Sequence, residues 1–262
     1  MNKRILSIVL FAFSALVLAT PNVQAQYIPD TYIGDVTLQV GLNNDPNNLD
    51  VYDPINQKYD VSGMNVNVVN NQLTVTLYGD YFSTWGTSPL SAEIYAPGSL
   101  FLSVNGWNPA GTSSDGYMAD NMYTGTTWDY AITLTGLGNG DMPATSGSTS
   151  LYDTGSGEIK PGMKRINQEA WFVPTEGENA LATGDWELGA TWLTITINLS
   201  ETDWDGISDI GLHWTMGCGN DVIEGAYHHS PGGSTPVPEP ATILLFGCGL
   251  LGLAGVARRR VR

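Results

Sequence analysis

Residues 63–78, with the sequence GMNVNVVNNQLTVTLY, decide the fold class of this chain. Apolar and polar residues alternate along both halves of this stretch, which is the pattern of β-strands that bury one face. Asn70 and Asn71 separate the two halves, and asparagine tolerates the positive φ that a tight hairpin turn demands. The stretch therefore predicts a two-stranded β-hairpin.

On both sides of this hairpin, short strand-like runs recur, and no long stretch shows the 3.6-residue period of an amphipathic helix. These runs predict further strands at residues 36–40, 99–104, 128–135, 170–173, 192–199 and 209–216. We therefore expect residues 26–229 to form one all-β domain, either a β-sandwich or a jelly roll. Residues 136–162 are rich in Gly, Ser and Thr, so we expect them to form a long surface loop.

Charged residues are few in this 262-residue chain, and they are unevenly placed. They make up 14% of the chain, the formal net charge is −16, and all 26 acidic residues lie between Asp30 and Glu239. Because a protein needs a basic patch to bind phosphates, this charge argues against nucleic acid as a partner. Six of the ten basic residues lie at the two ends, beside apolar runs, as they do in segments that charge orients in a membrane.

The N-terminus has the three parts of a signal peptide, which we place at residues 1–25. Lys3 and Arg4 precede a mostly apolar run at residues 5–18, which is too short to span a bilayer comfortably. Small residues then precede a cleavage site between Ala25 and Gln26. The sequence therefore predicts an exported protein that begins at Gln26 after cleavage, and an uncleaved membrane anchor is the alternative.

The C-terminus contains a second apolar run at residues 241–257, which has no charged residue and the length of a minimal membrane span. Four arginines follow it and would stay on the cytoplasmic side: Arg258, Arg259, Arg260 and Arg262. A short proline-containing segment, which prevents a helix from starting earlier, comes directly before it: Val237, Pro238, Glu239 and Pro240. Residues 230–236 have the composition of a flexible linker between the domain and this tail.

The order of these parts over residues 237–262 resembles the PEP-CTERM sorting signal, a tail that is also labelled an ice-binding protein C-terminal domain. The Val-Pro-Glu-Pro segment, the glycine-rich span and the arginine cluster all match. The resemblance implies that signal peptidase and exosortase, an enzyme of Gram-negative bacteria, act on the chain during export. It also implies transient anchoring in the inner membrane and a final place at the cell surface or in the extracellular matrix. A plain C-terminal membrane anchor is the alternative.

The folded domain offers three acidic clusters that could bind a metal ion, and one of them forms a partial pattern. Asp203, Asp205 and Asp209 stand close together in one loop, and Ca²⁺ prefers oxygen ligands from a turning loop. An EF-hand is excluded because Leu212 stands where its bidentate glutamate belongs. The three aspartates are therefore candidate ligands of a structural calcium ion, and we expect no other cofactor.

The turn after the last predicted strand has a structural interpretation. Asn220 and Asp221 follow two glycines there, and their side chains are expected to bond backbone donors. Cys218 is the one cysteine of the predicted domain, so we expect it to be buried as a small apolar residue rather than paired in a disulfide.

No catalytic motif is visible in the sequence. The chain lacks the Gly-x-Ser-x-Gly nucleophile turn, a phosphate-binding loop and the spacing of a zinc site. His213 lies in a predicted strand and is expected to pack there. We therefore expect no catalytic residue and no enzymatic activity. A secreted polysaccharide hydrolase is the alternative, because sequence alone does not reveal two carboxylates a few ångströms apart.

The eight tryptophans exceed what a core of this size requires, and aromatic faces stack on sugar rings. Trp107 and Trp204 lie beside turn residues, so a glycan-binding module that contacts extracellular polysaccharide through them is a second alternative. Two Thr-x-Thr fragments, residues 74–76 and 194–196, are too few to predict a flat threonine surface. We therefore favour an exported, exosortase-sorted protein of the cell surface or matrix, with a non-enzymatic β domain.

Overall fold

The computed structural model describes residues 25–39, 59–85, 96–139, 142–199 and 207–228, all within the unit formed by residues 23–235. Residues 1–24 of the predicted signal peptide, the linker at 230–236 and the tail at 237–262 lie outside the described residues. No helix in the described part is long and apolar enough to cross a membrane.

The described chain is built almost entirely of β-strands. The strands are β1 (Gln26–Pro29), β2 (Gly63–Val69), β3 (Gln72–Tyr78), β4 (Pro97–Ser103), β5 (Tyr130–Thr135), β6 (Gly138–Asn139), β7 (Met142–Pro143), β8 (Ser146–Asp153), β9 (Gly157–Pro161), β10 (Glu169–Pro174), β11 (Ala182–Leu188), β12 (Trp192–Asn198), β13 (Asp209–Met216) and β14 (Val222–His228). The short helices are α1 (Asp80–Trp85), η1 (Ser113–Asp115) and η2 (Thr154–Ser156). The expectation of an all-β domain is therefore confirmed for the described residues.

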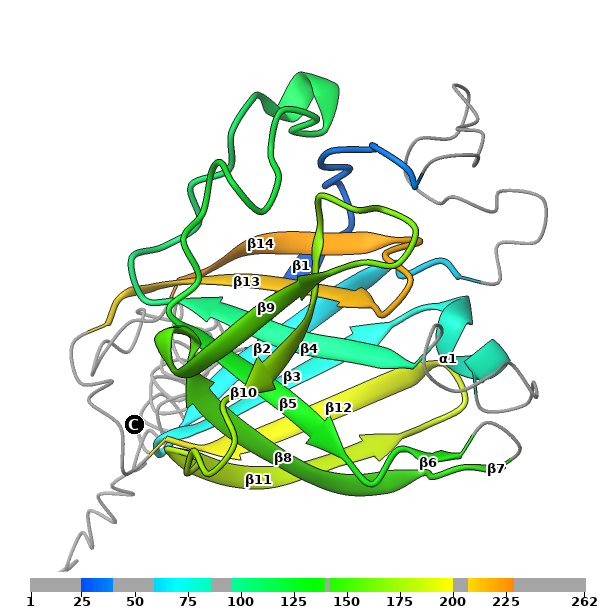
Figure 1. The fold of residues 1–262 in the computed structure, drawn as a ribbon, viewed down its shortest axis with the longest axis vertical. Helices are drawn as coiled ribbons and strands as arrows, with labels where there is room; N and C mark the ends of the chain where they lie inside the picture. Colours follow the sequence, from blue (N-terminus) through cyan, green and yellow to red (C-terminus); the bar gives the residue numbers. More distant parts are fainter. Residues whose placement is uncertain (1–24, 40–58, 86–95, 140–141, 200–206, 229–262) are drawn as a thin grey trace, which may run out of the picture. The chain divides into compact units, whose positions relative to one another are not determined.

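One antiparallel sheet contains ten of these strands, in the order β1-β2-β3-β12-β11-β8-β5-β4-β13-β14 (Figure 1). The sheet curls into a barrel-like form, and the Gln26 side chain bridges its two edges. The Gln26 amide donates to the Ala226 carbonyl over 2.8 Å and accepts from the His228 N–H over 2.9 Å. This arrangement differs from the expected β-sandwich or jelly roll, because the strands form one continuous ladder instead of two facing sheets.

The hairpin predicted at residues 63–78 is present as β2 and β3. Asn70 has φ 51° and Asn71 has φ 62°, which is the left-handed conformation that a two-residue hairpin turn requires. Val66 and Val75 form one of the cross-strand pairs, and both are fully buried. Alternation along the sequence therefore placed the apolar residues on the inner face of the sheet, as predicted.

A second layer covers part of the outer face of the sheet. The β9–β10 hairpin lies across β4, β5 and β13 (Figure 1). Phe172 of β10 packs with Phe101 of β4, and its N–H donates to the Ser99 hydroxyl over 3.0 Å. Gly98 permits this approach, because a Cβ there would lie 2.4 Å from two backbone oxygens, those of Ala170 and Thr215. Strands β4 and β13 are therefore buried on both faces.

Two expectations about local structure are wrong. Residues 136–162 are not one long loop, because they contain strands β6 to β9 and the helix η2. Strand β8 pairs with β11 on one side and with β5 on the other, so it lies in the middle of the sheet. The predicted strand at residues 36–40 is reduced to an isolated bridge between Leu38 and Arg165 in its described part.

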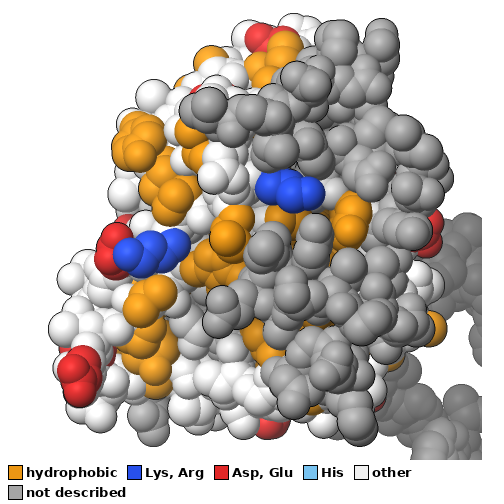
Figure 2. Space-filling model, turned by 45° about the vertical axis from the view of Figure 1, so that its right-hand side comes forward, with side chains coloured by type: hydrophobic (Ala, Val, Ile, Leu, Met, Phe, Trp, Pro, Cys, Tyr) orange, Lys and Arg blue, Asp and Glu red, His pale blue; other side chains and the backbone are white. Residues whose placement is uncertain are grey.

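Charged side chains are few on the visible face of the described unit (Figure 2). On the face in Figure 2, red and blue side chains are sparse, and orange hydrophobic groups form separate patches among white atoms. This appearance follows from the low content of charged residues, 14% of the chain.

Candidate functional site

A buried polar cluster lies between the sheet and its covering layer. His213 of β13 and Glu224 of β14 are cross-strand partners. Leu212 and Trp214, the neighbours of His213, face the main core, so alternation turns the His213 side chain outward beneath the covering layer. Glu169, the first residue of β10, adds a third polar side chain from the covering layer. All three side chains are buried.

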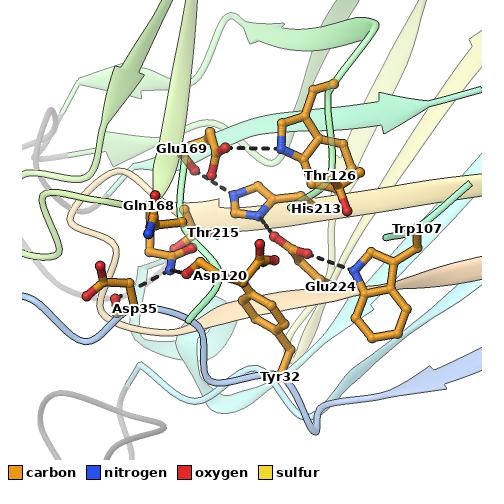
Figure 3. Close-up of polar contacts among 12 residues, drawn as sticks. Tyr32, Asp35, Trp107, Asp120, Thr126, Gln168, Glu169, His213, Thr215 and Glu224 are labelled. Atoms are coloured by element: carbon orange, nitrogen blue, oxygen red, sulfur yellow. Dashed lines mark hydrogen bonds and ion pairs between the residues drawn. The ribbon is translucent and has the colours of Figure 1, made fainter. Parts of the chain in front are cut away.

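The imidazole of His213 is held between two oxygen atoms (Figure 3). Its Nδ1 lies 2.7 Å from Glu224 Oε1, and its Nε2 lies 2.6 Å from the backbone oxygen of Glu169. A carboxylate and a carbonyl only accept hydrogen bonds, so both ring nitrogens must donate. The geometry therefore describes an imidazolium that is paired with the Glu224 carboxylate.

Two tryptophan N–H groups complete the hydrogen bonding of the carboxylates. Trp107 donates to Glu224 Oε2 over 2.8 Å, and Trp128 donates to Glu169 Oε1 over 3.2 Å. The Trp128 ring also lies against the imidazole of His213, with 5.5 Å between the ring centroids. Each buried charge therefore has donors or acceptors around it, which offsets part of the cost of its desolvation.

A third carboxyl group, that of Asp120, lies beside this cluster. Asp120 is buried, accepts from the Tyr32 hydroxyl over 3.1 Å and accepts from the Ala110 N–H over 3.0 Å. Gln168 approaches from the other side, and its amide nitrogen lies 3.4 Å from the Asp120 backbone oxygen. The cluster thus ties β10, β13, β14 and the loop between β4 and β5 together.

Burial and neighbouring charges shift several pKa values in the same direction. Burial raises the pKa of Glu169, and burial together with the Glu224 charge raises the pKa of Asp120 to about 7. Burial alone would lower the pKa of His213, but the hydrogen bond and charge of Glu224 outweigh it and raise this pKa to about 9. Folding therefore favours the protonated form of all three groups.

The same residues form a set that could approach a metal ion. One ligand atom each from Glu169, His213 and Glu224 lie within 4.8 Å of one another. Both ring nitrogens of His213 already donate to oxygen atoms, however, so a metal would first have to replace a proton. The hydrogen-bonded imidazolium explains the observed contacts without a metal.

Glu169 and Trp128 of the cluster line a pocket at the surface. This pocket of about 470 Å³ is lined by Trp128, Thr126, Thr154 and Glu169 among other residues, but by neither His213 nor Glu224. A general base must accept a proton from a bound substrate. His213 is fully buried and has no free lone pair, so in this arrangement it has no position from which to do so.

The shifted pKa values lead to a prediction about pH. In the unfolded chain His213 titrates near 6.5, so its contribution to stability is fully present below that pH and is lost as the pH rises through about 9. The raised pKa values of Asp120 and Glu169 act with the same sign, because the folded state binds more protons than the unfolded state. We expect Tm to be lower at about pH 9.5 than at about pH 6 by roughly 5–10 °C.

Thermal unfolding followed by circular dichroism at both pH values checks this expectation. A His213→Leu variant is the control, because it should lose the part of the slope that belongs to His213. A Tm that rises between these pH values would contradict the assignment of an imidazolium.

The structure places the remaining candidate residues as follows. Asp209 is the first residue of β13, where its carboxylate accepts from Ser208 and lies 2.5 Å from His228 Nδ1. Asp203 and Asp205 lie outside the described residues, so the calcium site stays a prediction. Trp107 is half-buried and points its N–H at Glu224, whereas Trp204 lies outside the described residues.

The structural expectations for the turn between β13 and β14 are confirmed in part. Asp221 accepts from the Val61 N–H over 2.6 Å and from the Val222 N–H over 2.9 Å, as a turn-capping residue does. The side-chain atoms of Asn220 are buried and have no hydrogen-bond partner among the described residues, so its predicted role is not seen. Cys218 is free and buried, and its burial raises the pKa of the thiol to about 11.

The buried cluster itself was missed by sequence reasoning, apart from the packing of His213 in a strand. The Trp107–Glu224 bond joins residues 117 positions apart, and the His213–Glu169 bond joins residues 44 positions apart. The one available signal for this cluster was the presence of a histidine and a glutamate in two neighbouring apolar stretches. A tight turn joins these stretches, so antiparallel register can pair the two residues.

Comparison with known proteins addresses the C-terminal tail. The family model of the PEP-CTERM protein-sorting motif matches residues 236–260. The chain carries a PEP-CTERM motif. The match includes Val237, Pro238, Glu239, Pro240, Arg258, Arg259 and Arg260, and Arg262 lies just beyond it. A PEP-CTERM motif implies export and sorting to the cell surface by exosortase.

The PEP-CTERM match covers the tail and does not extend into the β domain. No curated protein and no solved structure matches the chain. What the β domain does must therefore be inferred from its own residues.

Proposed function

We propose that this protein is an exported structural component of the cell surface or extracellular matrix of a Gram-negative bacterium, with a β domain that catalyses no reaction. The PEP-CTERM motif at residues 236–260 is the observation that carries the proposal. Exosortase would recognise the segment from Val237 to Pro240 while the run at residues 241–257 holds the chain in the inner membrane. The four terminal arginines would keep the end of the tail in the cytoplasm.

The position of β1 supports cleavage by signal peptidase between Ala25 and Gln26. Strand β1 begins at Gln26, so this cleavage would leave the whole strand in the mature protein. It would also keep the Gln26 side chain, which bridges β1 and β14. The predicted cleavage site thus lies directly before strand β1.

The buried cluster supports a β domain without enzymatic activity. Its histidine donates from both nitrogens, lies outside the pocket that Glu169 lines, and ties three strands together. These are properties of a group that stabilises a fold. The hydrolase alternative would need two carboxyl groups around a substrate. Glu169 is the one acidic residue among the described residues that line the pocket beside the cluster, so this pocket lacks the second group.

The experiment that tests this proposal is fractionation of the native cells, followed by intact-mass analysis of the product. We expect a product that begins at Gln26 and lacks the residues after the Val237–Pro240 segment, found in the surface or matrix fraction. A product that still ends at Arg262 in the inner membrane would refute sorting. Release of reducing ends from envelope polysaccharide by the purified chain would refute the absence of enzymatic activity.

A further inference from the structure

The sheet carries a second surface of functional interest, the outer face of β2, β3, β12, β11 and β8. The two Thr-x-Thr fragments of the sequence meet there on neighbouring strands. Thr76 pairs with Thr194 and Thr74 pairs with Thr196, and the hydroxyls of Thr76 and Thr194 lie 3.0 Å apart. Antiparallel pairing therefore joins two fragments that are more than 100 residues apart into one array.

Neighbouring strands extend this array into two rows of polar side chains. Strand partners lie about 4.7–4.9 Å apart, and successive rows lie about 6.8 Å apart along each strand. The first row, in order across the sheet, is Tyr27, Asn65, Thr76, Thr194, Glu187 and Ser146. The second row is Asn67, Thr74, Thr196, Asp185, Ser148 and Thr135. All these side chains are exposed or half-buried, and none is basic or aliphatic.

Aromatic residues border one side of the rows. Tyr78 and Trp192 are cross-strand partners, and both are half-buried. Each lies two positions along its strand from Thr76 or Thr194, so both are on the same outer face. Tyr27, at the end of the first row, is 53% exposed. The face thus combines aromatic rings with hydroxyl, amide and carboxylate groups.

The array is also hollowed. A depression of about 720 Å³ lies over β8, β11 and β12, and its lining includes Ser148, Asp185, Glu187 and Thr196. Most residues that line the depression are Ser, Thr or Gly, which have short side chains or none, so a ligand can approach the sheet closely. Ser and Thr lose little side-chain entropy when a ligand orders them, which lowers the cost of binding.

We propose that this face, hereafter the hydroxyl face, binds a neutral polysaccharide. Serine and threonine hydroxyls both donate and accept, and carboxylates accept from neighbouring sugar hydroxyls. The rings of Tyr78 and Trp192 supply apolar surface for a sugar ring. Because the rows contain Asp185 and Glu187 and no basic residue, an anionic polymer is repelled. The same two charges interrupt the uniform uncharged lattice that a face for ordered water would need.

This inference moves the predicted glycan contact away from Trp107, whose N–H is engaged by Glu224. It rests on the proposed function in one respect, because an exported domain is the one that meets extracellular polymers. Binding is measured on the purified chain and sorting is measured by mass, so failure of either is seen separately.

The test is affinity electrophoresis of the full chain, in a mild non-ionic detergent, through gels that contain glucomannan, hydroxyethyl cellulose or alginate. A Thr194→Val, Thr196→Val double variant removes two hydroxyls from the array but keeps side-chain shape and strand propensity. The matched control is Thr175→Val, which removes an exposed hydroxyl from the loop after β10.

We expect retardation of the unmodified chain and of the Thr175→Val control by at least one neutral polymer, and none by alginate. The double variant should bind at least about fivefold more weakly, because two hydrogen bonds are lost. Equal retardation of all three chains, or retardation by alginate alone, would overturn the proposal. So would absence of retardation together with inhibition of ice recrystallisation that the double variant loses, which would identify a water-ordering surface instead.

Discussion

Replacement of Arg258, Arg259, Arg260 and Arg262 by glutamine is expected to abolish maturation of the protein. In the proposed function the positive charges would hold the end of the tail on the cytoplasmic side of the membrane, and glutamine removes these charges while it keeps polarity. Without these charges the apolar run at residues 241–257 would no longer be held in the membrane with the Val237–Pro240 segment in reach of exosortase. We expect the precursor to accumulate with its tail intact, as intact-mass analysis of cell fractions would show.

The control for loss of positive charge is a Lys160→Gln, Lys164→Gln variant, because these lysines lie in the folded domain. It should mature as the unmodified chain does. If the arginine variant also gives a product of unchanged mass in the surface fraction, the tail is not read in the proposed way.

The second large effect is expected at the buried ion pair. His213→Leu fills a site that is lined by Phe101 and Trp128, but it leaves the Glu224 carboxylate buried without its cationic partner. Removal of one partner of a buried pair costs about 3–5 kcal/mol. Urea unfolding, followed by tryptophan fluorescence, should show this loss as a lower midpoint.

Two further variants separate the charge from the change in shape. Adding Glu224→Gln to His213→Leu removes the unpaired charge, so the double variant should regain part of the lost stability. His228→Gln breaks an exposed pair, in which the side chains of His228 and Asp209 are 68% and 51% exposed, and should leave the urea midpoint nearly unchanged. An unchanged midpoint for His213→Leu would show that the pair does not stabilise the fold.

The pH prediction and the two stability variants depend on the same physical property, the burial of three carboxyl groups with one imidazole. Glu169, Asp120 and Glu224 are each less than 5% exposed, and His213 is fully buried. A fold that binds protons more strongly than its unfolded chain is most stable on the acidic side of neutrality.

Strands with regular alternation were predictable because local information is sufficient for them. The hairpin at residues 63–78 and the strand at 209–216 match β2, β3 and β13. Strand β8, by contrast, contains Gly147 and Thr149 on its inner face, so its sequence has almost no apolar period. Gly147 is needed there for packing, because a Cβ at this position would lie 2.5 Å from the Trp186 Nε1.

The sequence by itself determined the all-β class and a tail with the order of the PEP-CTERM motif, because strand alternation, proline, apolar length and arginine clustering are local properties. Tertiary structure alone decided that one sheet closes on itself, that His213 meets Glu224, and that the two Thr-x-Thr fragments form one face. Pairing between distant strands sets each of these features. It depends on which edges meet, and no short stretch of sequence encodes that choice.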